Sequence, residues 1–226
     1  MIPTPKSVLP PLSEHELLNR CQKIAGQTLG QIATEIGWVI PPDLRQHKGW
    51  VGILLEAYLG ASAGNKAEPD FMEIAVEMKT LPLNAQGMPK ESTYVCTVQM
   101  LQTGELCWQD SWVKRKLEKV LWVPVEAEPT IPLGERYIGD AWIWQPSMEQ
   151  EEILQRDWDE LMDYIVLGQQ ESLTAKQGEY LQIRPKAANS QVLVTGISEE
   201  GEINKINPKG FYLRTCFTRK ILEQSK

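Results

Sequence analysis

Residues 70–80 read Asp-Phe-Met-Glu-Ile-Ala-Val-Glu-Met-Lys-Thr, and this stretch sets the expected architecture of the chain. From Phe71 onward apolar side chains recur at alternate positions, which is the period of a β-strand. Successive side chains of a strand point to opposite faces, so we expect Glu77 and Lys79 on one face. Asp70 stands where the strand begins. The pattern can therefore bring two carboxylates and one ammonium together.

This combination of groups suits the hydrolysis of a phosphodiester. Carboxylates such as Asp70 and Glu77 are hard oxygen ligands of the kind that Mg²⁺ prefers. An ammonium beside the metal, here that of Lys79, can orient the attacking water and offset charge on the phosphorus. A strand of alternating charges is also typical of a solvated sheet face, so the spacing alone leaves a structural role open.

Other features of the chain favour a metal-dependent nuclease. Its only histidines are His15 and His47, which argues against histidine-based hydrolysis or a multi-histidine metal site. The expected helix 50–59 is mostly apolar but carries one acid, Glu56. The link at 60–66 contains two glycines that allow this helix and the strand to approach closely. It departs from a nucleotide-binding P-loop, because only three residues separate its glycines.

The charge balance does not exclude a polyanionic partner. The formal net charge is −7, and residues 149–171 alone account for it with eight acids and one base. The remainder of the chain balances at 22 bases against 22 acids. Bases gather at 114–119 and from Ser172 to the end. A phosphate responds to the local field within a Debye length of roughly 8–10 Å, so a basic cleft can bind it despite the acidic average.

The cysteines and the N-terminal sequence indicate a cytoplasmic protein. The four cysteines show no CxxC pairing, so neither a zinc knuckle nor a disulfide framework is indicated, and we expect reduced thiols. The first residues lack the apolar run of a signal peptide. No stretch approaches the ~20 apolar residues of a membrane span, so no membrane association is expected.

The periodicity predicts a mixed α/β fold, with helices flanking a central sheet. We expect one globular unit, residues 1–226, with one core or one core divided between two lobes. Helices are expected after the capping-box pattern of Ser13 and Glu16, and at 28–36, 50–59 and 150–167. Strands are expected from residue 71 and at 93–100, 119–125, 137–142, 180–183 and 210–214. Residues 189–196 fit either a helix or a strand.

The helix expected at 150–167 is amphipathic. Its apolar stripe would face the core while its acids face water. That stripe consists of Trp158, Leu161, Met162, Ile165 and Val166. A second hypothesis is that the acidic face keeps DNA off this side of the molecule or docks a partner protein.

Several continuous stretches of the sequence closely resemble the MutH family of DNA mismatch repair endonucleases. The resemblance runs from about Leu17 to Phe217 and is far more specific than the pattern of acids. The matching stretches are residues 48–56 (KGWVGILLE), 59–66 (LGASAGNK), 70–71 (DF), 76–80 (VEMKT), 120–124 (VLWVP), 157–163 (DWDELMD), 181–189 (LQIRPKAAN) and 210–213 (GFYL).

The resemblance implies a type II restriction-endonuclease-like fold, with an N-terminal catalytic lobe and a C-terminal DNA-reading lobe that form a clamp around double-stranded DNA. It implies a Mg²⁺-dependent enzyme that nicks the unmethylated strand at hemimethylated GATC sites. MutL would be its activator, with MutS acting indirectly after it finds a mismatch, and the enzyme is expected to be a monomer.

The same resemblance implies the roles of individual residues. Asp70, Glu77 and Lys79 would be the active-site set, with Asp70 and Glu77 as metal ligands and Glu56 as a further acid nearby. Lys48 and Lys116 would contact DNA beside the scissile phosphate, Arg184, Pro185 and Lys186 would lie on the DNA-reading loop, and Tyr212 would sense adenine methylation. Arg184 is chemically suited to pair bidentately with guanine, and Lys186 to contact a phosphate or a single acceptor.

Two departures from the family pattern concern possible DNA contacts. Residues 112–116 read Trp-Val-Lys-Arg-Lys, which retains Lys116 and the positive charge but lacks the expected histidines. Tyr94 stands where phenylalanine is expected and adds a hydroxyl. Two alternative functions remain open: a GATC-type restriction endonuclease that cuts both strands as a dimer, and a non-catalytic DNA-binding or docking module.

Overall fold

A computed structural model of the chain describes residues 8–44, 47, 49–64, 68–100, 107–174, 176–186, 193–197 and 202–225. The chain divides into two compact units. Unit 1 comprises Met1–Lys90 and Lys119–Gln145, and unit 2 comprises Glu91–Glu118 and Pro146–Lys226. The backbone therefore passes between the units three times.

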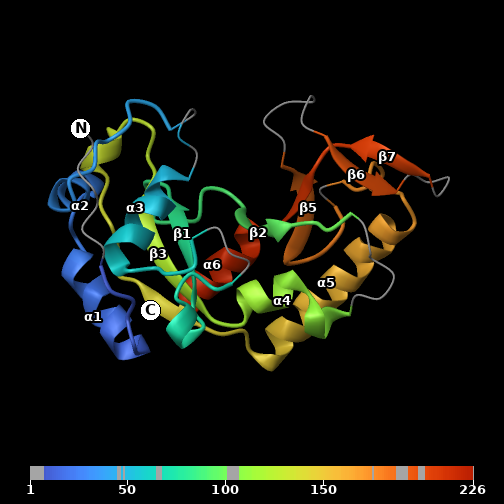
Figure 1. The fold of residues 1–226 in the computed structure, drawn as a ribbon, viewed down its shortest axis with the longest axis horizontal. Helices are drawn as coiled ribbons and strands as arrows, with labels where there is room; N and C mark the ends of the chain where they lie inside the picture. The colour runs from blue at the N-terminus through green and yellow to red at the C-terminus, as the bar shows by residue number, and fades with distance from the viewer. Residues whose placement is uncertain are drawn as a thin grey trace. The chain divides into compact units, whose positions relative to one another are not determined.

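Unit 1 is built on a three-stranded sheet of order β1-β3-β4. β1 runs parallel to β3, and β4 is antiparallel to β3 (Figure 1). The strands are β1 (Glu77–Leu83), β3 (Val120–Glu126) and β4 (Trp142–Trp144), and the helices are α1 (Glu14–Ile24), α2 (Leu29–Glu35), α3 (Trp50–Leu59) and the 3₁₀ turns η1 (Met72–Ile74) and η4 (Leu133–Glu135).

Helices α1 and α2 of unit 1 begin where a side-chain cap accepts a hydrogen bond from one of the first backbone N–H groups. Ser13 caps α1 by accepting a hydrogen bond from the backbone N–H of Glu16 at 3.1 Å. Glu16 does not complete the expected capping box, because its carboxylate accepts from the backbone N–H of Leu12 at 2.9 Å. The reciprocal capping box occurs instead in α2, between Thr28 and Gln31.

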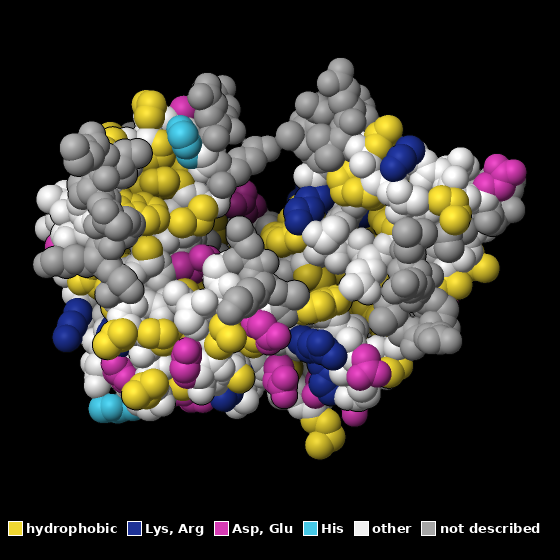
Figure 2. Space-filling model, in the orientation of Figure 1, with side chains coloured by type: hydrophobic (Ala, Val, Ile, Leu, Met, Phe, Trp, Pro, Cys, Tyr) yellow, Lys and Arg dark blue, Asp and Glu magenta, His cyan; other side chains and the backbone are white. Residues whose placement is uncertain are grey.

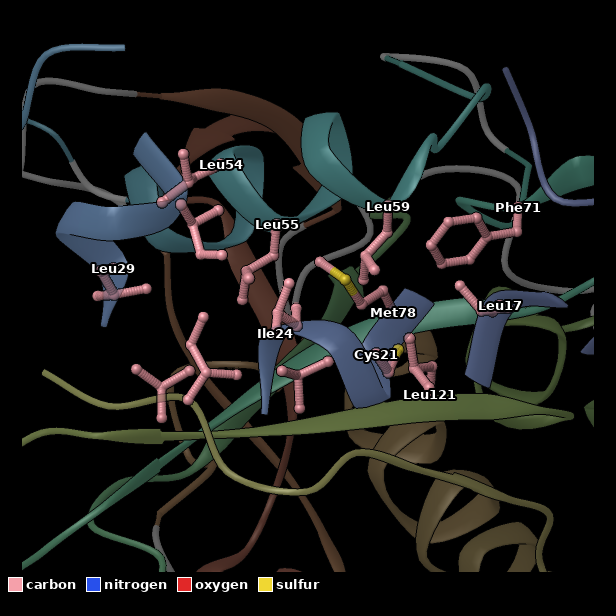
Figure 3. Close-up of a cluster of buried hydrophobic side chains, with 14 of the residues drawn as sticks. Leu17, Cys21, Ile24, Leu29, Leu54, Leu55, Leu59, Phe71, Met78 and Leu121 are labelled. Atoms are coloured by element: carbon pink, nitrogen blue, oxygen red, sulfur yellow. The ribbon is translucent and has the colours of Figure 1, made fainter. Parts of the chain in front are cut away.

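The core of unit 1 lies between these helices and one face of the sheet (Figure 3). Met78 of β1 and Leu121 of β3 are register partners whose side chains join this cluster. Leucines of α3 and the apolar side of α1 pack onto them. Because side chains alternate along a strand, burial of Met78 in this core turns Glu77 and Lys79 to the opposite face of the sheet.

Unit 2 contains a three-stranded antiparallel sheet of order β2-β8-β5 and a separate two-stranded β6-β7 sheet. Its strands are β2 (Thr93–Thr97), β5 (Leu181–Pro185), β6 (Val194–Ile197), β7 (Ile203–Ile206) and β8 (Lys209–Leu213). Its helices are η3 (Trp108–Asp110), α4 (Trp112–Leu117), α5 (Met148–Val166) and α6 (Thr215–Gln224). Contacts join α5 to β5 and α4 to β2.

The acidic helix α5 departs from its predicted pattern at two positions. Most of the predicted stripe is buried, namely Trp158, Leu161, Met162 and Ile165. Val166, however, is 43% exposed, and Asp157 is only 2% exposed. The prediction that all acids of this helix face water is therefore wrong for Asp157.

Asp157 is buried because it satisfies the backbone at the start of β5. Its Oδ2 accepts hydrogen bonds from the backbone N–H groups of Glu179, Tyr180 and Leu181, at 2.9, 2.6 and 2.9 Å. Gly178 has a φ of +76°, and a Cβ there would lie 2.0 Å from the carbonyl oxygen of Leu181. A side chain is thus excluded at the turn where α5 supports the strand.

The mixed α/β class is confirmed, although the strands lie in three sheets. Three strand predictions were wrong in their limits. The strand expected at 93–100 is β2, which ends at Thr97. Residues 72–74 form the 3₁₀ turn η1, so β1 begins at Glu77, and the strand expected at 137–142 is β4 at Trp142–Trp144. Tyr137 and Ile138 make only isolated bridges. Among the helices of the described residues, none has both the length and the apolar character to cross a membrane.

Candidate functional site

A tight hairpin places Asp70 beside the first residues of β1. Phe71 is fully buried, and its backbone exchanges two hydrogen bonds with Val76, at 2.9 and 3.2 Å. The hairpin closes through Ala75, whose φ of +52° is left-handed, a conformation that costs a non-glycine residue roughly 1–2 kcal/mol. The Asp70 carboxylate then accepts a hydrogen bond from the backbone N–H of Met78 at 2.8 Å.

The backbone of Asp70 also fixes the segment that follows α3. Its carbonyl oxygen accepts hydrogen bonds from the N–H groups of Ser62 and Ala63, at 2.9 and 3.3 Å. Gly60 ends α3 with a φ of +88°, and a Cβ there would lie 2.6 Å from the carbonyl oxygen of Leu9. The glycine at this position is therefore required by both conformation and space, and α3 is tied closely to the hairpin.

Glu77 and Lys79 form a buried ion pair on β1. The Lys79 ammonium donates to Glu77 Oε1 at 3.0 Å, and each side chain is only 7% exposed. The backbone N–H of Glu77 donates to the carbonyl oxygen of Lys119 at 3.0 Å, which fixes the start of β1 next to β3. The predicted contact between these two side chains is thus present, and the Asp70 carboxylate is hydrogen-bonded to the backbone of Met78, the residue between them.

Glu56 lies in α3 and is half-buried. Among the described residues there is no group of three or more His, Cys, Asp or Glu side chains that could hold a metal ion together. Glu56, Asp70 and Glu77 therefore do not form one three-acid cluster. The structure brings Asp70 and Glu77 to the start of β1 and leaves Glu56 in the neighbouring helix.

A second group of predicted residues lies on one face of the β2-β8-β5 sheet in unit 2. Tyr212 of β8 pairs with Tyr94 of β2 on one side and with Gln182 of β5 on the other. Gly210 similarly pairs with Thr97 and with Arg184 of β5. Residues 210 and 212 are two apart on β8 and therefore share a face of the sheet. The cross-strand row through Tyr212 thus lies next to the row through Gly210.

Arg184 is held by hydroxyl and aromatic groups of this face. Its guanidinium donates to the Ser92 hydroxyl at 2.7 Å and lies 5.9 Å from the centroid of the Tyr212 ring. The Tyr212 ring meets that of Tyr94 edge to face, with 5.4 Å between centroids. Partial burial raises the pKa of Tyr212, the nearby Tyr94 adds to the rise, and the Arg184 charge opposes it.

Lys186 follows the end of β5 and is held by two hydroxyl groups of β2. Its ammonium donates to Tyr94 Oη at 2.5 Å and to Thr97 Oγ1 at 2.7 Å. It also lies 4.5 Å from the centroid of the Tyr94 ring. Pro185 is exposed at the end of β5, between the two cations.

The three basic residues at 114–116 differ in their contacts. Lys114 pairs with Glu151 of α5 at 2.9 Å and also donates to Gln109, so its charge is used within unit 2. Arg115 lies over the Trp112 ring, 5.4 Å from the centroid. Lys116 is half-buried in α4. Lys48 lies outside the described residues.

Side chains of both charge signs are visible on the face drawn in Figure 2. This distribution agrees with the near balance of charges outside residues 149–171. Local clusters, such as the one around Arg184 and Lys186, therefore determine where a polyanion would be attracted.

Sequence reasoning missed Ser92 and Thr97 as partners of the predicted DNA-reading residues. The available signal was the hydroxyl of Tyr94, noted as a departure from the family pattern. The contact of Thr97 depends on a register shift in β2 between Tyr94 and Cys96. Simple alternation would place residues 94 and 97 on opposite faces, so the sequence pattern alone concealed this contact.

Comparison with known proteins identifies one family. The family model described as "DNA mismatch repair enzyme MutH" matches residues 59–157, which include Asp70, Glu77 and Lys79. The chain is 53% identical over 213 residues to the DNA mismatch repair protein MutH of Yersinia pseudotuberculosis serotype IB (strain PB1/+). It is 52% identical over the same length to the protein of that name from Yersinia enterocolitica serotype O:8 / biotype 1B. Each alignment covers 94% of this chain and 93% of the relative.

Proposed function

The chain belongs to the MutH family of DNA mismatch repair endonucleases, and from that premise we propose that it nicks the unmethylated strand of DNA at hemimethylated GATC sites. The observation that carries the proposal is the buried Glu77–Lys79 pair, with the Asp70 carboxylate fixed beside it by the backbone of Met78. Burial of two charged groups at one strand end, beside the half-buried carboxylate of Asp70, is costly unless these groups serve a purpose such as binding a metal and a phosphate.

The proposed cofactor is Mg²⁺, held by Asp70 and Glu77. Membership of a nuclease family indicates a divalent metal, and two carboxylates are a donor set with which Mg²⁺ is commonly bound beside phosphate oxygens. Each carboxylate has two oxygens. The contacts of Asp70 Oδ2 with Met78 and of Glu77 Oε1 with Lys79 are therefore compatible with coordination by the same groups. A bound ion would supply Lewis acidity and lower the pKa of a water molecule.

The remaining steps are assigned to side chains of this site. The Lys79 ammonium orients the attacking water and stabilises negative charge at the phosphate, and its ion pair with Glu77 keeps it in place. Glu56 is proposed as an additional acid that adjusts the charge of the site from α3. The products would carry 5′ phosphate and 3′ hydroxyl ends.

The proposed DNA-reading residues lie in unit 2. Arg184 would contact guanine, Pro185 would fix the loop backbone, and Tyr212 would sense the adenine methyl group. Lys116 and Lys48 would contact the backbone near the scissile phosphate. Support for this assignment comes from the exposed position of Arg184 and Pro185 at the end of β5 and from the contact of Arg184 with the Tyr212 ring.

We further propose that each unit contributes contacts to double-stranded DNA, that MutL activates the enzyme after MutS finds a mismatch, and that the chain acts as a cytoplasmic monomer. These assignments follow from family membership. They predict that MutL raises the nicking rate without a change in the oligomeric state of this chain.

A plasmid assay tests the proposed function against its rivals. Supercoiled plasmid with one hemimethylated GATC site is incubated with the protein, Mg²⁺ and MutL, beside a fully methylated plasmid. Nicked circles from the hemimethylated plasmid alone are the expected result. Linear DNA would instead identify a restriction enzyme that cuts both strands, and intact plasmid with retained binding would identify a non-catalytic module.

The Glu77→Ala variant tests the assignment of the active site. It is expected to bind the duplex as the unmodified chain does and to lose nicking, because one of the two metal ligands is gone. Nicking by this variant at the rate of the unmodified chain would remove Glu77 from the mechanism.

A further inference from the structure

A β-bulge in β2 places Tyr94 and Thr97 on the same face of the sheet. Tyr94 pairs with Tyr212, Cys96 pairs with Phe211, and Thr97 pairs with Gly210. Between the first two pairs β2 advances by two residues while β8 advances by one, so β2 contains one extra residue. Beyond the bulge the alternation is reversed, and the Thr97 hydroxyl comes to the face that carries Tyr94.

Gly210 leaves space for side chains to reach across β8. It lies between Arg184 of β5 and Thr97 of β2 in the register. A Cβ at this position would lie 3.0 Å from the Tyr94 ring and 3.2 Å from the Tyr212 ring. Without that atom, the Lys186 side chain from the β5 end meets the hydroxyls of β2, two strands away.

The three polar groups form a closed triangle. The Lys186 ammonium donates to both hydroxyls, and Tyr94 Oη lies 2.9 Å from Thr97 Oγ1, so one hydroxyl donates to the other. An ammonium has three N–H donors, and each hydroxyl has one O–H. Two N–H groups and one O–H are used within the triangle, which leaves one N–H and one O–H to donate outward.

We propose that Tyr94 and Thr97 are positioning residues that fix the ammonium of Lys186, and that this ammonium and one of the two hydroxyls donate to one acceptor oxygen of bound DNA. The inference rests on the proposed function and deepens it. Fixing the ammonium before binding lowers the cost of ordering a flexible lysine side chain on the DNA. The Tyr94 ring under the ammonium adds a further restraint.

The test compares hydroxyl deletions in the full chain. Tyr94→Phe keeps the ring and removes Oη, and Thr97→Val removes Oγ1 at nearly constant volume. Thr97→Ser is the rescue variant, because it restores the hydroxyl. Thr93→Val is the matched control, since this β2 threonine is buried and its hydroxyl has no hydrogen-bond partner among the described residues.

Binding of each variant to a GATC duplex is measured by fluorescence anisotropy without added metal. Tyr94→Phe and Thr97→Val are each expected to weaken binding about 5-fold, the scale of the net contribution of one hydrogen bond. Thr97→Ser and Thr93→Val are expected to bind as the unmodified chain does. Melting temperatures measured in parallel identify any variant whose fold is impaired.

A double-mutant cycle with Lys186→Met separates positioning from independent contacts. If the hydroxyls act through the ammonium, Tyr94→Phe loses most of its effect when Lys186→Met is already present. Fully additive effects, or hydroxyl deletions that leave binding unchanged, would overturn the inference.

Salt dependence and a scrambled duplex identify the source of the acceptor oxygen. For a backbone phosphate, Lys186→Met lowers the slope of log affinity against log salt by about 1 and weakens both duplexes alike. For a base oxygen, the loss is confined to the GATC duplex. An unmodified chain that binds neither duplex would refute the proposed function. Unchanged hydroxyl variants of a chain that binds and nicks would refute only this inference.

Discussion

Lys79 and Glu77 are two charged side chains at a site with almost no exposure to water, so each depends on the other for stability. Lys79→Met would leave the Glu77 carboxylate buried without this ammonium. We expect the variant to lose about 3 kcal/mol of unfolding free energy, the usual effect of breaking a buried ion pair. Chemical denaturation monitored by tryptophan fluorescence measures the loss.

The double variant Glu77→Gln, Lys79→Met is the control for this prediction. It removes both charges, so most of the lost stability should return, while nicking stays absent. A double variant that is no more stable than Lys79→Met would show that charge pairing does not determine stability at this position.

For single residues, much of the candidate site could be predicted from the sequence. The period of two was sufficient to place Glu77 and Lys79 on one face, because alternation along a strand is a property of the backbone. The hydrogen bond that fixes Asp70 to Met78 could not be predicted. It depends on a hairpin closed by a left-handed alanine, and alanine gives no sequence signal for that conformation.

Among the secondary-structure elements, α5 supports β5 through one buried carboxylate. Asp157→Asn would keep the size of the side chain but replace a charged acceptor of three N–H groups by a neutral one. We expect a loss of about 2 kcal/mol in unfolding free energy, in line with charged hydrogen bonds. Asp159→Asn is the matched control, because this neighbour is exposed, and partial desolvation and then the charge of Asp163 raise the pKa of its carboxyl. Equal losses in the two variants would contradict the prediction.

The contact between α4 and α5 should depend on pH. Hydrogen bonds from Lys114 and then from Trp108 lower the pKa of Glu151. The stability that Glu151 contributes is therefore present above its unfolded pKa, near 4.3, and is lost as the pH falls through the folded value. We expect Glu151→Gln to cost at most about 1 kcal/mol at pH 7, because the pair is partly exposed. The difference should vanish in acid. Melting curves between pH 7 and pH 3 would measure it, and a difference that persists at pH 3 would contradict the assignment.

Elements with a strong local signal were predicted well, and those without one were missed. α3 has the predicted limits, since its apolar run ends at a glycine in the left-handed conformation. α4, α6 and β7 were not predicted. α4 is only six residues long, and the exposed residues of β7 give no apolar alternation. The pattern at 72–75 has the period of a strand, but tertiary contacts turn it into the hairpin beside Asp70.

For the whole molecule, the acidic face of α5 should limit non-specific binding of DNA. Replacement of Glu152, Glu160 and Asp163 by lysine changes the formal net charge from −7 to −1, since each exchange adds two charges. All three side chains are exposed. We expect tighter binding to a scrambled duplex at low salt, with the difference reduced at 0.15 M salt by screening. Filter binding across a salt series measures it.

The same positions changed to glutamine and asparagine give an intermediate charge of −4 and should give an intermediate effect. Scrambled-duplex affinity and MutL stimulation that stay unchanged in the lysine variant would exclude both a DNA-repelling and a partner-docking role for this face.

The division of the chain has a consequence for fragments of this protein. Unit 1 receives β3 and β4 only after the backbone has completed β2 and α4 of unit 2. An N-terminal piece that stops at Lys90 would therefore carry β1 without its parallel neighbour, and truncated genes should yield insoluble products. Complementary halves of this enzyme for a reporter could not each contain one whole unit, because the backbone crosses between the units three times, and circular permutation would leave the alternation of their segments unchanged.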